Sequence, residues 1–141
     1  MTCEAYTFFF LFMQVNTLGT VELLNITKQC ESVSSFVYLS ALQPAADEKY
    51  LLPLCQEGSA MDIAKNILDQ QESPQYKPLY NNGYLFSKSL TEHILRDEIS
   101  KMSKENLLHI SIMRLAPVGP SVREPLIGWV SYLERERETM K

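Results

Sequence analysis

A chain of 141 residues is long enough for one domain and too short for two. Its 45% hydrophobic and 21% charged residues are typical of a globular protein, and its net charge of −4 argues against a nucleic-acid-binding surface. Cys3, Cys30 and Cys55 form no paired motif, which fits a reducing compartment. With only His93 and His109 beside them, we expect no metal site.

The first distinctive element is the apolar run Tyr6–Met13, YTFFFLFM. It is far shorter than the ~20 residues that a membrane-spanning helix needs, so we expect no spanning segment. No Lys or Arg precedes the run, unlike the start of a signal peptide. We expect a buried strand or the start of a helix; the alternative is a short anchor at a membrane surface.

Helical spacing of apolar residues predicts a helix over residues 16–31. The short β-branched and aromatic run Phe36–Ser40 predicts a buried strand. Prolines indicate that residues 41–58 are mostly loop. Ser59 is a suitable N-cap for a short helix that ends at Leu68.

The second half repeats this alternation. A loop is expected at residues 73–78, a long helix at 82–101 and an apolar strand at 107–114. Prolines break the chain after the strand, and residues 130–141 form a charged helix or frayed tail with a solvated face. Helices that alternate with continuous apolar strands predict parallel strands that are covered on both faces, and hence an α/β layered fold.

The most informative motif is Tyr84-Leu85-Phe86-Ser87-Lys88 in the long helix, where Tyr84 and Lys88 share a face one turn apart. Phe86, Leu90 and Ile94 occupy the opposite side and are expected to pack on the sheet. A free tyrosine has a pKa of ~10, and a neighbouring cation lowers the pKa of such a phenol toward useful acidity. The pair can therefore give a proton to a carbonyl oxygen as a hydride reaches the carbon. By itself, the motif is equally the pattern of an ordinary i,i+4 pair on a solvated helix.

The order of these features over residues 15–130 resembles the extended short-chain dehydrogenase/reductase superfamily. Within it, the chain is similar to the alcohol-forming fatty acyl-CoA reductases. Four segments carry this resemblance: VNTLGTVELLNITKQC, SSFVYLSA, NNGYLFSKSLTEHIL and RLAPVGPSVREPLIGWV, the last of which contains Arg123-Glu124-Pro125 and Gly128-Trp129.

The resemblance implies a Rossmann-type fold in which NADPH reduces a long-chain acyl-CoA to an aldehyde and then to a fatty alcohol. Tyr84 would be the general acid, and Lys88 its partner and a ligand of the cofactor ribose. Asn16 matches the asparagine of the proton-relay group, and Arg114 would lie along the nicotinamide side of the cleft. The family implies a location in the cytoplasm or at peroxisomal or endoplasmic reticulum membranes.

The chain departs from the family in the phosphate-binding loop. The family begins with a strand, a Gly-x-x-Gly-x-x-Gly turn and a helix that holds the pyrophosphate through backbone N–H groups. None of the five glycines of this chain forms that motif. We therefore expect a partial Rossmann-type parallel sheet that lacks the first nucleotide-binding βαβ unit and has an exposed edge.

Further departures concern the catalytic strand and the ends of the chain. Ala41 falls where the family has a catalytic serine or threonine, and Ser40 substitutes for it only if the strand register shifts by one residue. Leu115-Ala116 replaces the usual Pro-Ser. We divide the chain into a divergent apolar N-terminus (1–15), the rear part of the reductase domain (16–130) and a charged end (131–141), as in a truncated or alternatively spliced product.

Two functions follow. The first is an NADPH-dependent fatty acyl-CoA reductase. The alternative is a catalytically inactive, truncated relative that is vestigial or binds a partner, for example a full-length reductase or a second copy through the open sheet edge. The missing phosphate loop favours the alternative for the chain on its own.

Overall fold

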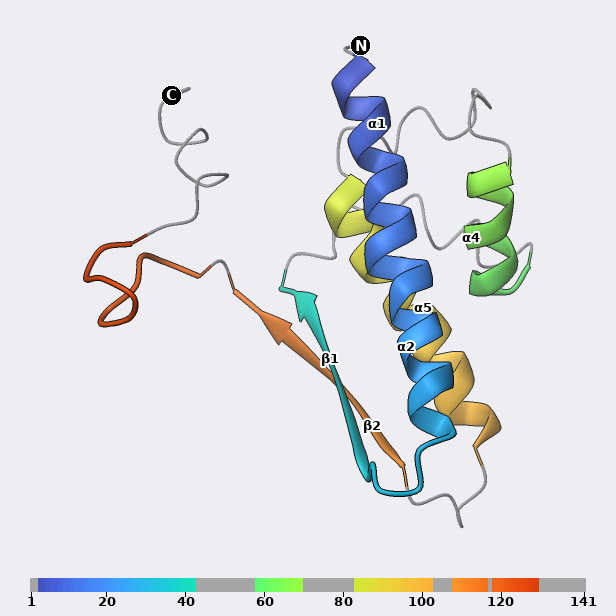
Figure 1. The fold of residues 1–141 in the computed structure, drawn as a ribbon. Coiled ribbons are helices and arrows are strands. Elements are labelled where there is room, and N and C mark those ends of the chain that lie inside the picture. The colour runs from blue at the N-terminus through green and yellow to red at the C-terminus, as the bar shows by residue number, and fades with distance from the viewer. Residues whose placement is uncertain (1–2, 43–57, 70–82, 103–107, 117, 130–141) are drawn as a thin grey trace.

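The computed structural model describes residues 3–42, 58–69, 83–102, 108–116 and 118–129. In chain order, its elements are α1 (Cys3–Phe12), η1 (Met13–Leu18), α2 (Gly19–Lys28), β1 (Ser35–Ala41), α4 (Ala60–Asp69), α5 (Gly83–Lys101) and β2 (His109–Leu115). Figure 1 shows the two strands on one side, the α1–α2 rod with α5 in the middle, and α4 beyond them. The predicted loop at 73–78, most of the loop at 41–58 and the charged end at 130–141 lie outside the described residues.

The N-terminal apolar run is helical, which confirms the second of its two expected forms. Phe12, Leu18 and Gly19 all have right-handed helical dihedrals, so α1, the π-helix η1 and α2 form one continuous rod. The helix predicted over 16–31 thus begins earlier and ends at Lys28.

Because of this continuity, the expectation of no spanning segment was based on too short a helix. It considered the short apolar run alone, whereas Thr7–Lys28 is one helix of 22 residues, long and apolar enough to cross a membrane by length and composition. Part of this helix is covered by protein, since 28% of the apolar window is buried in the fold.

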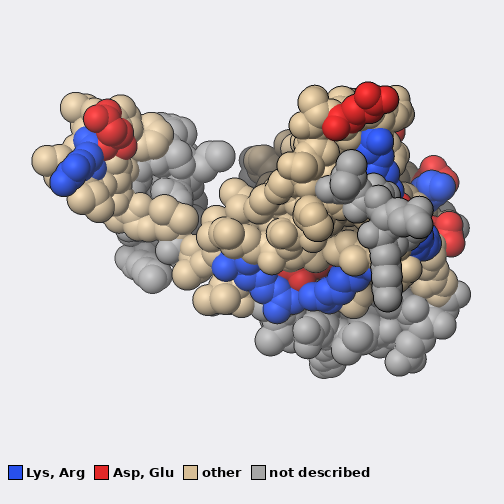
Figure 2. Space-filling model, turned by 90° about the horizontal axis from the view of Figure 1, so that it is seen from below, with Lys and Arg blue, Asp and Glu red and all other residues tan. Residues whose placement is uncertain are grey.

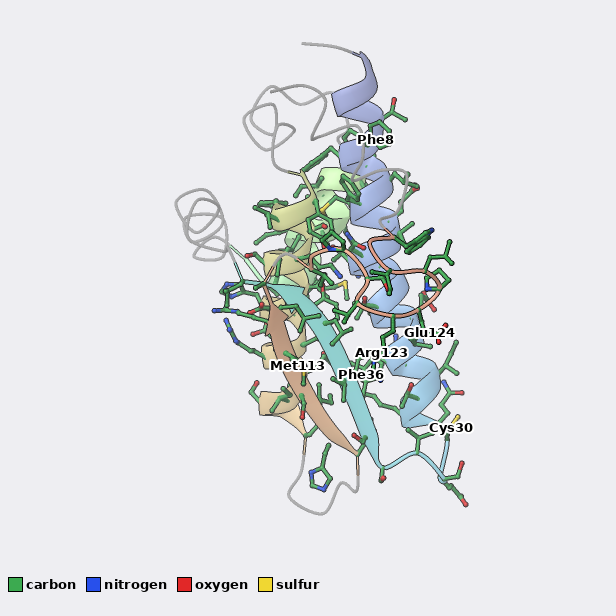
Figure 3. The ribbon with its side chains drawn as sticks, turned by 90° about the vertical axis from the view of Figure 1, so that its left-hand side faces the viewer. Phe8, Cys30, Phe36, Met113, Arg123 and Glu124 are labelled. Atoms are coloured by element: carbon green, nitrogen blue, oxygen red, sulfur yellow. The ribbon has the colours of Figure 1, made fainter. Side chains whose placement is uncertain are left out.

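The two strands form a parallel pair, as predicted, in register from Ser35 opposite His109 to Ala41 opposite Leu115. One face of the pair is covered by helices: Phe36 and Tyr38 are buried there with Leu24 of α2 and Leu95 of α5. Side chains of the opposite face, such as Met113, are about half exposed (Figure 3). The described sheet therefore has one covered face and one open face, so the expectation of strands covered on both faces is not met within the described residues.

The main core lies between helices. Phe9 and Met13 of the N-terminal rod, Ile67 of α4, and Phe86 and Leu90 of α5 are all fully buried in one cluster. Ile94 belongs to the same cluster, so the expectation that Phe86, Leu90 and Ile94 pack on the sheet was wrong. The reason is that the N-terminal rod and α4 cover this side of α5, while the sheet contacts another.

The helix α4 begins as predicted. Ser59 accepts a hydrogen bond on its hydroxyl from the backbone N–H of Asp62 (3.2 Å). The Ser59 hydroxyl also donates to the carboxylate of Asp62 (2.7 Å). Such a cap satisfies a helix N–H group that otherwise has no partner.

The proline-rich segment after β2 forms a closed loop at residues 118–129, away from the helices in Figure 1. The backbone N–H of Ser121 donates to the carbonyl of Trp129 (2.9 Å), and that of Gly128 to Ser121 (2.8 Å). The Glu124–Pro125 bond is cis, and Gly128 has a φ of 78°, which suits glycine. Arg123 and Glu124 lie on this loop (Figure 3).

Candidate active site

The N-terminal rod contributes Asn16, which lies in the π-helix η1. A π-helical turn is rare and is frequently found at functional sites. The Asn16 amide donates to the hydroxyl of Ser87 (3.0 Å), and that hydroxyl donates to the backbone carbonyl of Tyr84 (2.7 Å). Asn16 is thereby connected through one serine to the first turn of α5.

A buried set of hydroxyl groups fixes η1 to α5 at this level. Thr91 donates to the backbone carbonyl of Ser87 (2.7 Å) and lies 3.1 Å from the hydroxyl of Thr17, which is itself 3.2 Å from the Ser87 carbonyl. All three side chains are fully buried. Sequence reasoning missed them, because isolated Ser and Thr residues in a helix carry no signal of the contacts they make.

Tyr84 and Lys88 share a face of α5, as predicted, and this face points to the carboxyl end of β1. The Lys88 ammonium donates to the backbone carbonyl of Leu39 (3.0 Å) and lies 5.7 Å from the centre of the Tyr84 ring. Burial lowers the pKa of Lys88. Tyr84 is 43% exposed, and its ring meets the edge of Phe12. The pair therefore sits at the end of a parallel strand with its phenol accessible.

The carbonyl that Lys88 binds belongs to the outer edge of the sheet. Two hydrogen bonds to β2 lie at the ends of β1. They use the carbonyl of Ser34, just before the strand, and the N–H of Leu42, just after it, and both residues have even numbers. In a parallel pair, one strand uses alternate residues, so the odd-numbered Leu39 directs its carbonyl away from β2. Lys88 thus occupies one acceptor on an edge to which another strand could add.

A second tyrosine flanks the same lysine. The ring centre of Tyr38 lies 5.0 Å from the Lys88 ammonium. Burial raises the pKa of Tyr38 to about 12, against a smaller opposing effect of the Thr91 hydroxyl. Among the described residues, no group meets the geometry of a hydrogen bond to the buried Tyr38 phenol oxygen. Of the two tyrosines, Tyr84 is the accessible one.

The remaining predicted site residues, Ser40 and Arg114, converge on Glu92, which the sequence analysis did not single out. Arg114 forms a two-pronged ion pair with the Glu92 carboxylate, at 2.9 Å through Nε and 2.7 Å through Nη2. Arg96 adds a third contact at 3.0 Å. The position of Arg114 along a nicotinamide cleft stays a prediction, and the described contacts of its guanidinium are with Glu92 of α5. In Figure 2, a row of basic side chains encloses a small acidic area.

Ser40 is buried on the same face of β1 as Tyr38, and its hydroxyl lies near enough to the Glu92 carboxylate to lower the pKa of that group. Although burial alone would raise it, the pKa of Glu92 is held below its ordinary value by Arg114, Ser40 and Arg96. The structure therefore brings together two sets of groups. Tyr84, Lys88 and Asn16 form one, and Ser40 and Arg114 meet at Glu92 in the other.

The described groups are better suited to bind a ribose of a dinucleotide than its pyrophosphate. An ammonium and an amide at a strand end are donors that match ribose hydroxyls. A pyrophosphate cradle requires open glycines at a strand-to-helix turn. Gly19 instead lies within a continuous helix with φ −58°, and Gly83 has Phe9 packed against it. Within the part of the chain that the structure describes, no cluster of three or more His, Cys, Asp or Glu could hold a metal ion.

A parallel strand pair covered by helices, with a Tyr/Lys pair at the strand end, defines part of an α/β nucleotide-binding domain. The sequence matches the NAD-binding family described as male sterility protein over residues 11–138. The chain belongs to this family, and its resemblance to the fatty acyl-CoA reductases is confirmed.

Curated relatives agree with this assignment. The chain is 23% identical to fatty acyl-CoA reductase 1 of Homo sapiens over 135 residues and 25% identical to that of Xenopus laevis over 132 residues. Each match covers 84% of this chain and 23% of the relative, so the chain spans about a quarter of the length of these proteins. No solved structure matches.

Proposed function

We propose that this chain carries the proton-donating part of a reductase that converts long-chain acyl-CoA to fatty alcohol with NADPH. The observation that supports this most is the placement of Lys88, which lies between the Leu39 carbonyl at the strand end and the accessible ring of Tyr84. Family membership supports the reductase class and the nicotinamide cofactor.

In this proposal, Tyr84 gives its phenolic proton to the substrate carbonyl oxygen. The Lys88 ammonium stabilises the phenolate that remains and donates hydrogen bonds to the ribose hydroxyls of the cofactor. NADPH, when bound, would supply one hydride to each of the two reductions, and the first reduction releases CoA as its thiol and leaves the aldehyde. The family resemblance would make Asn16 a member of the proton-relay group; its described contact, through Ser87 to the backbone carbonyl of Tyr84, holds this turn of α5 in place.

Cofactor binding is the first test, because no Gly-x-x-Gly-x-x-Gly loop occurs in these residues. We expect NADPH to raise the melting temperature and to change its own fluorescence when it is titrated into the chain. A bound ligand at a hundredfold excess over Kd stabilises by roughly 2.7 kcal/mol. The matched ligand is NADH, which lacks only the 2′-phosphate. No response to millimolar NADPH would contradict cofactor binding by the chain alone.

The proton donor is tested with a pair of tyrosines. We expect Tyr84→Phe to lower NADPH-dependent reduction of a long-chain acyl-CoA by about 10²–10⁴-fold, the usual contribution of a positioned acid, without changing NADPH binding. Tyr38→Phe is the control, since it makes the same chemical change at a buried phenol and leaves the ring beside Lys88. Equal turnover of Tyr84→Phe and the unsubstituted chain would remove Tyr84 from this role.

The competing proposal is that the chain is a catalytically inactive relative. The measurements of NADPH binding and acyl-CoA reduction also test this proposal. The feature that favours it is the open face and edge of the sheet, where Val37, Leu39 and Met113 are each about half exposed. A chain that neither binds NADPH nor reduces acyl-CoA, yet associates with itself or a reductase through this surface, would support that alternative.

A further inference from the structure

We propose that Glu92 is a positioning residue: its carboxylate ties α5 to the carboxyl ends of both strands and so sets where Tyr84 and Lys88 stand. This inference rests on the proposed function for its catalytic meaning. Its structural content concerns α5 and the two strands alone.

The first support is the spacing along α5. Tyr84, Lys88 and Glu92 follow one another at intervals of four residues, so they share one face of the helix. Glu92 is the deepest of the three, with 2% of its side chain exposed, whereas Tyr84 is 43% exposed. The helix is thus anchored at one end of this face and presents its reactive groups at the other.

The second support is the pair of strands that meet at this carboxylate. Ser40 of β1 and Arg114 of β2 are directly opposite each other in the sheet. The Arg114 guanidinium bonds the Glu92 carboxylate, and the Ser40 hydroxyl lies near enough to lower the pKa of that carboxylate. A two-pronged arginine–carboxylate pair fixes both distance and orientation. One side chain of α5 therefore fixes the helix against two neighbouring strand ends.

The third support is the direction of the Arg114 side chain. The resemblance implied that Arg114 lines the nicotinamide side of the cleft, but its Nε and Nη2 are both directed to Glu92. If Glu92 holds this arginine, removing either partner has the same consequence for Lys88. If Arg114 is a cofactor ligand, only its own removal weakens NADPH binding.

The experiment compares amide substitutions on the 141-residue chain. Glu92→Gln removes the anchoring charge, and Glu98→Gln is the matched control. Glu98 also lies on α5 and pairs with two lysines, Lys28 at 2.6 Å and Lys101 at 3.1 Å, but near the far end of the helix. Arg114→Met and the double variant with Glu92→Gln complete a double-mutant cycle.

The primary measurement is the NMR signal of Lys88 after reductive ¹³C-methylation, assigned with Lys88→Arg. Methyl groups on this amine lie close to the rings of Tyr38 and Tyr84, so their resonance is displaced from that of the other lysines. We expect Glu92→Gln and Arg114→Met each to remove most of this displacement, the double variant to add nothing, and Glu98→Gln to retain it. A folded Glu92→Gln chain with an unchanged Lys88 signal would overturn the inference.

Kinetics give the second measurement. We expect Glu92→Gln to lower kcat by about 10²-fold, the effect of a small misplacement, with little change in KM for NADPH. An increase in KM for NADPH in Arg114→Met alone would instead make Arg114 a cofactor ligand and contradict the inference. If the unsubstituted chain is inactive, the proposed function fails, while the Lys88 signal still decides the role of Glu92.

A more conservative substitution tests the inference if Glu92→Gln does not fold. Arg114→Lys keeps a cation beside Glu92 but loses the planar fork of the guanidinium. We expect it to weaken the Lys88 displacement in a folded protein. Full retention of the displacement in Arg114→Lys would show that the two-pronged pair does not set the position of α5.

Discussion

The helical layer and the sheet of this protein differ in how completely they are covered. In the helical layer, Phe9, Met13 and Phe86 are fully buried in one cluster with side chains of α4. In the sheet, Val37 and Met113 lie on the open face, and about half of each side chain is exposed. The core between the helices is thus closed, although Val15 on the outer side of the rod is 61% exposed, whereas the described part of the sheet has a single covered face.

This difference bears directly on the site. Asn16, Tyr84 and Lys88 belong to the rod and to α5, and buried hydroxyl contacts hold these helices together. These three residues are therefore held in place by contacts that do not depend on a complete Rossmann sheet. The pyrophosphate loop of such a domain belongs to a strand-to-helix turn, and none of the glycines supplies it.

The largest expected effect comes from truncating one side chain in each region to alanine and comparing the losses of stability. We expect Phe86→Ala to lower the free energy of unfolding by about 3–5 kcal/mol, because a fully buried ring is lost. Met113→Ala, on the open face of the sheet, should change it by no more than about 0.5 kcal/mol. Urea denaturation of both variants measures the difference. Similar losses would show that the sheet face is covered in solution.

A glycine pair tests how closely the helices approach. A Cβ at Gly83 would lie 2.8 Å from the Phe9 ring and 3.1 Å from its Cα, so Gly83→Ala should cost about 1–3 kcal/mol through overpacking. Gly19→Ala is the control. Gly19 is helical, and its nearest heavy atom would be 3.5 Å away, so alanine should stabilise by about 0.5–1 kcal/mol. Thermal melts that show no loss in Gly83→Ala would contradict the tight contact between α1 and α5.

Local patterns were sufficient to predict the elements. The strand at Phe36–Ser40, the strand that ends near Arg114, the long helix and the Ser59 cap all appear where the sequence placed them. The parallel arrangement also followed from the alternation of helices with continuous apolar runs. These features depend on side-chain periodicity and turn chemistry within a few residues, which a single sequence contains.

Contacts between distant segments could not be predicted in the same way. The helix periodicity located Phe86 on the face opposite Lys88, but only the fold shows that this face meets Phe9 of α1. The partner of Arg114 is 22 residues away on another element, so its turn toward Glu92 was missed. The roles of Tyr84, Lys88, Asn16 and Ser40 in catalysis stay predictions.

The acid sensitivity of folding should depend on Glu92. The pKa of Glu92 is lowered in the folded chain, so its contribution to stability is present above its ordinary value of 4.5 and is lost as pH falls through the lower folded value. We expect Glu92→Gln to flatten the acid limb of stability below pH 4.5. Denaturation midpoints measured across this range test the expectation. An unchanged acid limb would show that Glu92 is not strongly paired in solution.

The smallest expected effect concerns the open face of the sheet. Val37→Thr exchanges a methyl group for a hydroxyl at nearly constant shape, which costs little in water and more in a buried contact. Because Val37 is 51% exposed, we expect the free energy of unfolding to change by no more than about 0.5 kcal/mol. Urea denaturation at two protein concentrations, together with sedimentation velocity, provides the measurement. A loss that grows with protein concentration would mean that a second copy covers this face, and the sheet would then be completed by association, as a parallel sheet with two apolar faces requires.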